Sequence, residues 1–395
     1  MIKKRRRLSP PAPEGEKSKR RRILLLAHTG RSDAIEAAIQ TCHQLLNSDL
    51  IPVMLRRDME QIEKHSHRHQ SQLGILSNVE ILGINTELPD IMLCMVLGGD
   101  GSVLRAAEFV HGYDIPILAV NLGHVGFLAE SERSDQQETV QRVVEDSYTV
   151  EERMSIDVKV WHNNELIAQT WALNEASVEK INRERMLEAV IEVDARPIST
   201  FGCDGVVLAT PTGSTAYAFS AGGPVVWPEV DALLLVPISA HALFARPMVI
   251  APTSVMAVEI LSRTESGGVL WCDGRRMVEL PPGARVEATR SPQPVKLARV
   301  NRTPFAERLV RKFELPTTGW RGPAKTEQQH GPTELEHQRR ASGAVTEALK
   351  IVEPRNITAA PPVTGRLNIN PADLRFHRNR KKNDDKQTDQ DTDQK

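Results

Sequence analysis

The sequence predicts an α/β domain followed by an all-β domain, with a polar tail at each end. Apolar runs alternate with helical patterns up to about residue 148, and short segments of alternating polarity follow up to about residue 321. Both ends are instead rich in charged and polar residues and proline. The 395 residues are 40% hydrophobic and 26% charged, which is enough apolar sequence for two ordinary cores.

The first domain, residues 22–148, is predicted to contain strands at 22–28, 51–57, 79–83, 91–99 and 115–123. Helices are predicted where apolar residues recur at helical spacing, at 32–48, 102–112 and 134–148. A Ser or Asp cap opens the first helix, and Gly112 ends the second. Strands that are apolar on every residue and separated by helices are typical of a parallel sheet covered on both faces. We therefore expect a Rossmann-like α/β domain.

The second domain, residues 149–321, changes character. Short segments rich in β-branched residues are broken by turn residues, at 149–180, 186–210, 254–262, 268–280 and 285–300. This pattern predicts an antiparallel β-sandwich-like domain. The boundary between the two domains is the expected place for a ligand cleft.

The tails differ in charge from the body between them. Residues 1–22 hold ten Lys or Arg against two Glu, whereas residues 23–321 hold 27 basic against 38 acidic residues. An acidic body argues against a general nucleic-acid binder. The basic tail, residues 1–21, could touch nucleic acid, but a disordered solvated arm is the preferred interpretation. Residues 322–395 are also predicted to be disordered.

Composition also predicts the compartment. No apolar stretch reaches the roughly 20 residues that span a bilayer, and no secretory signal follows the basic N-terminus. The four cysteines are widely spaced, adjoin apolar sequence and form no CxxC pair: Cys42, Cys94, Cys203 and Cys272. These features favour a cytoplasmic protein with reduced, buried thiols.

A glycine turn, Gly98–Gly101, holds a carboxylate between a strand and a helix. Backbone N–H groups at a helix N-terminus favour an anion, and Gly98 and Gly99 would let a phosphate chain approach closely. The carboxylate of Asp100 would repel phosphates unless it accepted a proton from a hydroxyl or helped to hold a metal. The alternative interpretation is a plain structural turn.

Other polar motifs follow strands in the second half. Asn174 and Glu175 could bind an adenine edge and ribose hydroxyls. Residues 201–224 are rich in glycine and hydroxyl residues, which suits phosphates or ribose, although a solvent-facing loop has the same composition. Asp273, Arg275 and Arg276 read as an ordinary hairpin turn. Three alternate histidines, His65, His67 and His69, lack acid or thiol partners, so a mobile loop is favoured over a metal site.

Together these motifs resemble the NAD kinase family. GGDG at 98–101, NE at 174–175, CDG at 203–205 and TPTGSTAYAFSAGGP at 210–224 occur in that family's order and spacing, as do NLGHVGFLAE, HALFARPMVI and CDGRR. The resemblance covers residues 22–321, and the actinobacterial type of NAD kinase is the most similar. The block at 210–224 is specific, whereas GGDG is shared with diacylglycerol, sphingosine and phosphofructo-kinases.

The resemblance implies phosphorylation of NAD on the 2′-hydroxyl of the adenosine ribose, giving NADP. ATP is the implied phosphoryl donor, with Mg²⁺ or another divalent cation, and some members of the family also accept polyphosphate. The resemblance further implies an N-terminal α/β domain, a C-terminal β domain, and a homodimer or homotetramer. NAD and ATP are thus the expected partners, with no membrane.

The resemblance also assigns roles to residues. It makes Asp100 the catalytic base, sets Gly101 against the substrate, and matches Asn174 and Glu175 to the pair that reads the adenosine half. Arg185 matches a position near the substrate phosphates, and Asp204 matches the acid near the nicotinamide. The remaining implied contacts with the dinucleotide are Gly98, Gly99, Thr215, Ala216, Tyr217, Ala218, Phe219, Ser220 and Arg275. No residue is assigned as a metal ligand, and Ser102 stands where the family commonly has Thr.

Two alternatives compete with this interpretation. A lipid or sugar kinase would share GGDG but leaves the block at 210–224 without a role. A non-catalytic dinucleotide sensor would gain nothing from a carboxylate beside phosphates. Assay of the protein with ATP, magnesium and NAD separates the three.

Overall fold

The computed structural model describes residues 21–66, 73–123, 126–129, 131–132, 135–264, 266–301 and 303–317. These described residues all belong to one compact unit. The two predicted tails, apart from residue 21, lie outside the described residues, as do His67, His69 and His124. Across the described residues, no helix is long and apolar enough to cross a membrane.

The first sheet is built on five parallel strands in the order β3-β2-β1-β4-β5. These strands are β1 (Arg22–Ala27), β2 (Ile51–Met54), β3 (Glu80–Ile81), β4 (Ile91–Leu97) and β5 (Ile117–Asn121). A short parallel strand, β6 (Ser131–Glu132), pairs with β5. The predicted strand at 51–57 is shorter than expected, because Arg56 already begins a helix.

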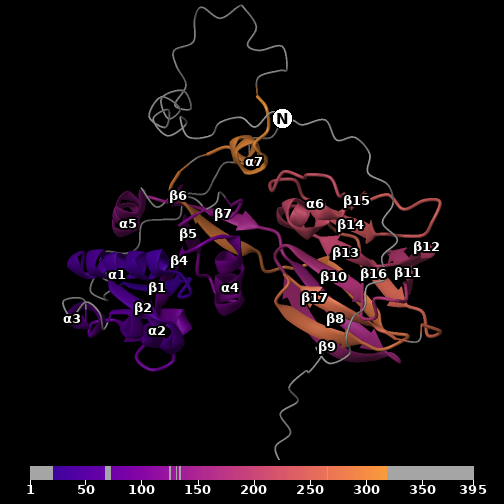
Figure 1. Cartoon of the computed structure of the whole chain (residues 1–395), viewed down its shortest axis with the longest axis horizontal. Helices are drawn as coiled ribbons and strands as arrows, with labels where there is room; N and C mark the ends of the chain where they lie inside the picture. Colours follow the sequence, from indigo (N-terminus) through magenta and orange to yellow (C-terminus); the bar gives the residue numbers. More distant parts are fainter. Residues whose placement is uncertain are drawn as a thin grey trace, which may run out of the picture. The chain divides into compact units, whose positions relative to one another are not determined.

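Helices cover both faces of this sheet (Figure 1). They are α1 (Ser32–Asn47), α2 (Arg56–Ser66), α3 (Leu73–Leu76), α4 (Asp100–Val110) and α5 (Gln136–Val144), with a 3-10 turn, η2, at Leu88–Asp90. Ile23 and Leu25 pack in one core with α1 and α5, whereas Leu24 and Leu26 pack in another with α4. Both faces of β1 are therefore buried, which explains its unbroken apolar run.

Two strands from later in the chain extend the first sheet. β20 (Val295–Arg299) pairs in parallel with β5, and β7 (Thr149–Arg153) pairs antiparallel with β20. Both strands come from the stretch assigned by sequence to the second domain. The chain thus leaves the first sheet after β7 and returns to it at β20, before α7 (Phe305–Phe313).

The second domain is a sandwich of two six-stranded antiparallel sheets (Figure 1). One sheet has the order β15-β14-β13-β10-β17-β18, with β10 at Glu175–Lys180, β13 at Gly205–Ala209, β14 at Leu233–Ile238, β15 at Met248–Ile250, β17 at Gly268–Cys272 and β18 at Arg276–Leu280. The other has the order β12-β11-β16-β19-β8-β9, with β8 at Ile156–His162, β9 at Glu165–Ala172, β11 at Leu187–Val193, β12 at Arg196–Cys203, β16 at Met256–Ile260 and β19 at Arg285–Arg290.

A single hydrophobic core joins the two sheets of the sandwich. Val158 and Val286 from one sheet pack with Val206 and Leu270 from the other, and all four are fully buried. The predicted fold class, an α/β domain followed by an antiparallel β-sandwich, is therefore confirmed. All four cysteines are buried, and burial raises the pKa of the Cys42 thiol to about 12.

Candidate active site

A cavity of about 440 Å³ opens beside the glycine turn. Its lining comes from the segment after β1, from the start of α4 and from the second domain: His28, Thr29, Gly30, Gly99, Gly101, Ser102, Arg105 and Arg275. β1 and β4 are adjacent in this sheet. β2 and β3 follow on the side of β1, whereas β5 follows on the side of β4. The cavity therefore lies at the carboxyl ends of the strands at the point where the order reverses, which is the usual ligand site of open α/β sheets.

The glycine turn leads directly into a helix N-terminus, as the sequence predicted. β4 ends at Leu97 and α4 begins at Asp100, with Gly99 as its N-cap. A Cβ at position 98 would lie 2.5 Å from the Ser102 hydroxyl oxygen, so this position needs glycine. The dipole at the N-terminus of α4 favours an anion such as a phosphate, although the N–H groups of Ser102 and Val103 already donate to the Gly99 carbonyl oxygen at 2.9 and 3.3 Å.

The Asp100 carboxylate is held by two backbone N–H groups. Phe127 donates to Oδ2 at 3.0 Å and Leu128 donates to Oδ1 at 3.1 Å. A Cβ at position 126 would lie 2.2 Å from Oδ1, so Gly126 lets the chain pass this close to the carboxylate. The side chain of Asp100 is thus fixed in one place, half-buried, between two glycines that line the cavity.

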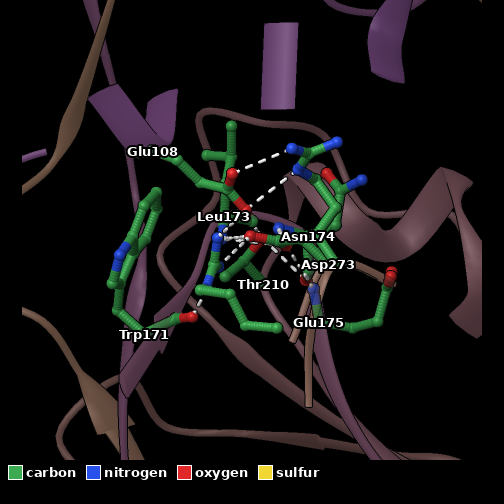
Figure 2. A network of polar contacts seen from close by, with 9 residues as sticks. Glu108, Trp171, Leu173, Asn174, Glu175, Thr210 and Asp273 are labelled. Atoms are coloured by element: carbon green, nitrogen blue, oxygen red, sulfur yellow. Dashed lines mark hydrogen bonds and ion pairs between the residues drawn. The ribbon is translucent and has the colours of Figure 1, made fainter. Parts of the chain in front are cut away.

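Asn174 and Glu175, at the junction of β9 and β10, are positioned by a buried carboxylate. Asp273 Oδ1 accepts hydrogen bonds from the backbone N–H groups of Asn174, at 2.7 Å, and of Leu173, at 3.1 Å. Figure 2 shows Asp273 lying beside Leu173, Asn174 and Glu175. Asp273 itself has a left-handed backbone, with φ of 54°, in the turn between β17 and β18. The sequence predicted only an ordinary hairpin turn at Asp273. The structure shows that this turn positions Asn174 and Glu175, the predicted binding pair.

An ionic network connects this turn to α4 (Figure 2). Arg276 Nη2 donates to Asp273 Oδ2 at 2.8 Å, and its Nη1 donates to Glu108 of α4 at 2.6 Å. Arg275 also binds Glu108 through two nitrogens, at 2.9 and 3.0 Å. The Arg276 guanidinium stacks on the Trp171 ring, 4.5 Å from its centroid. The helix that begins at Asp100 is thereby tied to the turn that positions Asn174 and Glu175.

The hydroxyl-rich block packs directly against the same pair. It forms a 3-10 turn, η4 (Thr212–Thr215), followed by one helical turn, α6 (Tyr217–Ser220). Thr210 Oγ1 donates to the carbonyl oxygen of Leu173 at 2.6 Å (Figure 2). A Cβ at position 213 would lie 2.0 Å from the Asn174 carbonyl oxygen, so Gly213 is needed for this close approach. The side chains of Tyr217 and Phe219 remain exposed.

Of the predicted site residues, all of which the structure describes, Gly99, Gly101 and Arg275 line this cavity and the others do not. Arg185 lies in the exposed segment between β10 and β11. Asp204 forms an ion pair with Lys180 at 2.5 Å, and this contact holds the pKa of its carboxyl below the usual value. Neither residue lines the cavity within the part of the chain that the structure describes. The structure thus brings Gly99, Gly101 and Arg275 together around the cavity. It brings the turn at 212–215 into contact with Asn174, next to Glu175.

Glu175 is a buried acid with an unused oxygen. Its side chain is 7% exposed, and Oε2 has no hydrogen-bond partner among the described residues. The pKa of the Glu175 carboxyl is raised to about 8, first by burial and then by the charge on Asp273. A hydrogen bond from the Tyr217 backbone opposes this shift. An unsatisfied buried oxygen is costly, so Oε2 is suited to bind a hydroxyl group of a ligand.

We expect the raised pKa of Glu175 to make stability fall as pH rises. Between the ordinary pKa of 4.5 and about 8, the folded protein holds this proton and the unfolded chain does not. The stability that the protonated Glu175 carboxyl contributes is therefore fully present below pH 4.5, and it is lost as the pH rises through 8. Glu175→Gln mimics the protonated acid, so its free energy of unfolding relative to the native protein should increase by up to about 1.4 kcal/mol per pH unit over this range. Urea unfolding of both proteins at several pH values measures this difference. If the free energies of unfolding of the two proteins changed with pH in parallel, this would contradict the raised pKa of Glu175.

Several site residues gave little signal in the sequence. His28 lines the cavity because it follows β1, and the rule that ligands bind at carboxyl ends of parallel strands could have found it. Glu108 lies on α4 with no motif around it, so its pairing with Arg275 and Arg276 has no sequence signal. Asp273 was visible only as part of an Asp-Gly turn.

The site was also tested for a divalent metal. Among the described residues, no group of three or more His, Cys, Asp or Glu side chains is arranged to hold a metal ion. Mg²⁺ commonly takes one or two carboxylates and completes its shell with water and substrate phosphates. Asp100 supplies one carboxylate at a helix N-terminus, a position that favours phosphates. The residues therefore fit a cation that enters with a nucleotide.

Comparison with known proteins gives one consistent result. Residues 23–148 match the family model described as the ATP-NAD kinase N-terminal domain, and residues 173–300 match the ATP-NAD kinase C-terminal domain. The chain is 56% identical over 306 residues to an NAD kinase of Leifsonia xyli, covering 77% of this chain and 97% of that protein. It is 54% identical over 304 residues to NAD kinase 2 of Streptomyces coelicolor, covering 76% of this chain and 97% of that protein.

Solved structures share the fold. A yeast NADH kinase in complex with NADH aligns with a TM-score of 0.67 at 21% identity, over 79% of this chain and 91% of that chain. An NAD kinase of Archaeoglobus fulgidus in complex with ATP aligns with a TM-score of 0.52 at 22% identity, over 75% of this chain and all of that chain.

The parallel sheet with a glycine turn at its switch point, joined to a β-sandwich that carries a hydroxyl-rich turn, defines a two-domain nucleotide-binding protein. Both of its domains match one family over most of the folded chain. The chain belongs to the ATP-NAD kinase family.

Proposed function

We propose that the protein transfers the γ-phosphoryl group of ATP to the 2′-hydroxyl of the adenosine ribose of NAD, giving NADP and ADP. The observation that carries this proposal is the place of Asp100. Its carboxylate is fixed by two N–H groups at the start of α4, between glycines that line a cavity of about 440 Å³. Family membership identifies NAD and ATP as the substrates to test.

In the proposed mechanism, Asp100 is the catalytic base. As the ribose oxygen forms its bond to the γ-phosphorus, the bond from that phosphorus to the bridging oxygen of ADP breaks. The hydroxyl proton passes to the Asp100 carboxylate during this step, because a ribose hydroxyl is too weak an acid to lose its proton beforehand. A divalent cation bound with the nucleotide would neutralise charge on its phosphates.

The dinucleotide would be held mainly by the second domain. Asn174 and Glu175 are the proposed contacts of the adenosine half, since Oε2 of Glu175 is buried without a hydrogen-bond partner among the described residues and could accept one from a hydroxyl. Tyr217 offers an exposed ring for stacking, next to the hydroxyl-rich turn. Arg185, Asp204 and Arg275 remain predicted contacts, as do the other residues of 215–220.

A direct assay tests the function. The full chain is incubated with NAD, ATP and magnesium, and NADP and ADP are quantified by mass spectrometry. We expect equal amounts of both, and a 2′-phosphate on the adenosine ribose by ³¹P NMR. Parallel reactions with polyphosphate in place of ATP, and with NADH in place of NAD, define donor and acceptor. Tight NAD binding without any NADP would instead indicate a dinucleotide sensor.

A further inference from the structure

Arg308 of α7 lies one peptide group away from the Asp100 carboxylate. The Arg308 side chain is 9% exposed, and its Nη1 donates to the carbonyl oxygen of Phe127 at 3.1 Å. That carbonyl belongs to the same peptide group as the N–H of Leu128, which donates to Asp100 Oδ1 at 3.1 Å. A guanidinium and a carboxylate therefore bind opposite ends of one amide.

This arrangement has electrostatic consequences. A cation at the carbonyl oxygen polarises the amide and strengthens its N–H as a donor, an effect that is larger in a buried site than in water. Both hydrogen bonds involve an ionised group, which makes each of them stronger than a neutral hydrogen bond. The orientation of the Asp100 carboxylate thus depends on a residue 208 positions later in the chain.

α7 is itself anchored to both parts of the site by aromatic rings. Phe305 and Phe313 pack on Phe127, with ring centroids 5.7 and 5.9 Å apart. Phe313 also packs on Phe219 of α6 at 4.6 Å, and Phe305 on Trp227 at 5.1 Å. These contacts hold α7, and with it the backbone of Arg308, next to the Phe127–Leu128 peptide.

We propose that Arg308 is a positioning residue for phosphoryl transfer, acting through the Phe127–Leu128 peptide on Asp100. The inference rests on the proposed role of Asp100 as base. Arg308 binds the carbonyl end of the Phe127–Leu128 peptide, the end away from Asp100, so we expect it to act on the carboxylate and not on either substrate. Its removal should change the rate of the chemical step more than the binding of NAD or ATP.

The test uses steady-state kinetics of the full chain with five variants, one of which is Asp100→Asn alone. Arg308→Gln should lower kcat by about 10- to 100-fold, the range for a hydrogen bond to a charged group, with KM for NAD and ATP nearly unchanged. Arg308→Lys keeps a cation and should recover part of kcat. In the Asp100→Asn background, Arg308→Gln should cost little further activity, because its target is gone. Lys312→Gln, at an exposed position of the same helix, should match the native protein.

Other outcomes overturn the inference and separate its causes. Native kcat in Arg308→Gln, or an equal loss in the Asp100→Asn background, shows that Arg308 does not act through Asp100. A loss shared by kcat, both KM values and the thermal unfolding midpoint, without recovery in Arg308→Lys, indicates a purely structural role. If Asp100→Asn alone retains native kcat, the proposed base is wrong and the inference falls with it.

Discussion

Replacing Asp100 with Asn should lower kcat by about 10²- to 10⁴-fold while leaving the dissociation constant for NAD within a few-fold of the native value. The amide has nearly the shape of the carboxylate but cannot take a proton from the ribose hydroxyl. Its carbonyl oxygen can still accept one of the two N–H groups, from Phe127 or Leu128, that hold the native side chain. The loss should therefore fall on the chemical step.

The measurement combines kcat from NADP formation with NAD binding by calorimetry. Glu138→Gln is a matched control, because it removes a carboxylate from the first turn of another helix, α5, at an exposed ion pair with Arg142. We expect this control to keep native kcat. An Asp100→Asn protein that binds NAD normally and turns over at the native rate would rule out Asp100 as the base.

The local features of the fold could be predicted from the sequence because short-range patterns determine them. Residues 23–27 are apolar on both faces of the strand, so a buried parallel strand was predictable. Gly98 to Asp100 combine a strand end, a close approach and a helix N-terminus within three residues, so the turn from strand to helix was predictable too. The family resemblance then supplied roles for these positions, which composition alone left open.

The long-range features could not be predicted in this way. β20 pairs with β5 although about 180 residues separate them, and no local pattern specifies that partner or its register. The contact between Arg308 and Phe127 spans 181 residues and depends on how α7 packs. The role of Asp273 as an acceptor could not be predicted either, because it depends on β17 lying beside β10. Sequence motifs identified the groups that are proposed to bind a ligand, whereas the residues that support those groups depend on tertiary contacts.

Asp273→Ala should be the most destabilising substitution in the site. Asp273 is 6% exposed and accepts from the backbone N–H groups of Leu173 and Asn174 and from Arg276. Alanine would leave both N–H groups without this acceptor and would remove the buried carboxylate from its ion pair with Arg276, a change that typically costs about 3–5 kcal/mol. Alanine also tolerates the left-handed backbone at φ of 54° poorly.

The Asp273→Ala substitution should weaken ligand binding as well as stability. The N–H groups of Leu173 and Asn174 fix the segment that carries Glu175, so without Asp273 this pair loses its orientation. We expect weaker NAD binding in Asp273→Ala, along with a free energy of unfolding lower by about 3–5 kcal/mol in urea. Asp273→Asn keeps one acceptor oxygen and tolerates the left-handed backbone, so it should lose less on both measures.

A surface ion pair provides the matched control. Arg263 and Glu188 are 2.5 Å apart but are 72% and 42% exposed, so Arg263→Gln should cost less than about 1 kcal/mol. If Asp273→Ala cost no more than this control, the buried carboxylate would be contributing no more than a surface charge. If it were destabilised but bound NAD normally, Asp273 would stabilise the hairpin without positioning Asn174 and Glu175. The expected result requires both losses in one variant, since the same hydrogen bonds hold the turn and orient the binding pair.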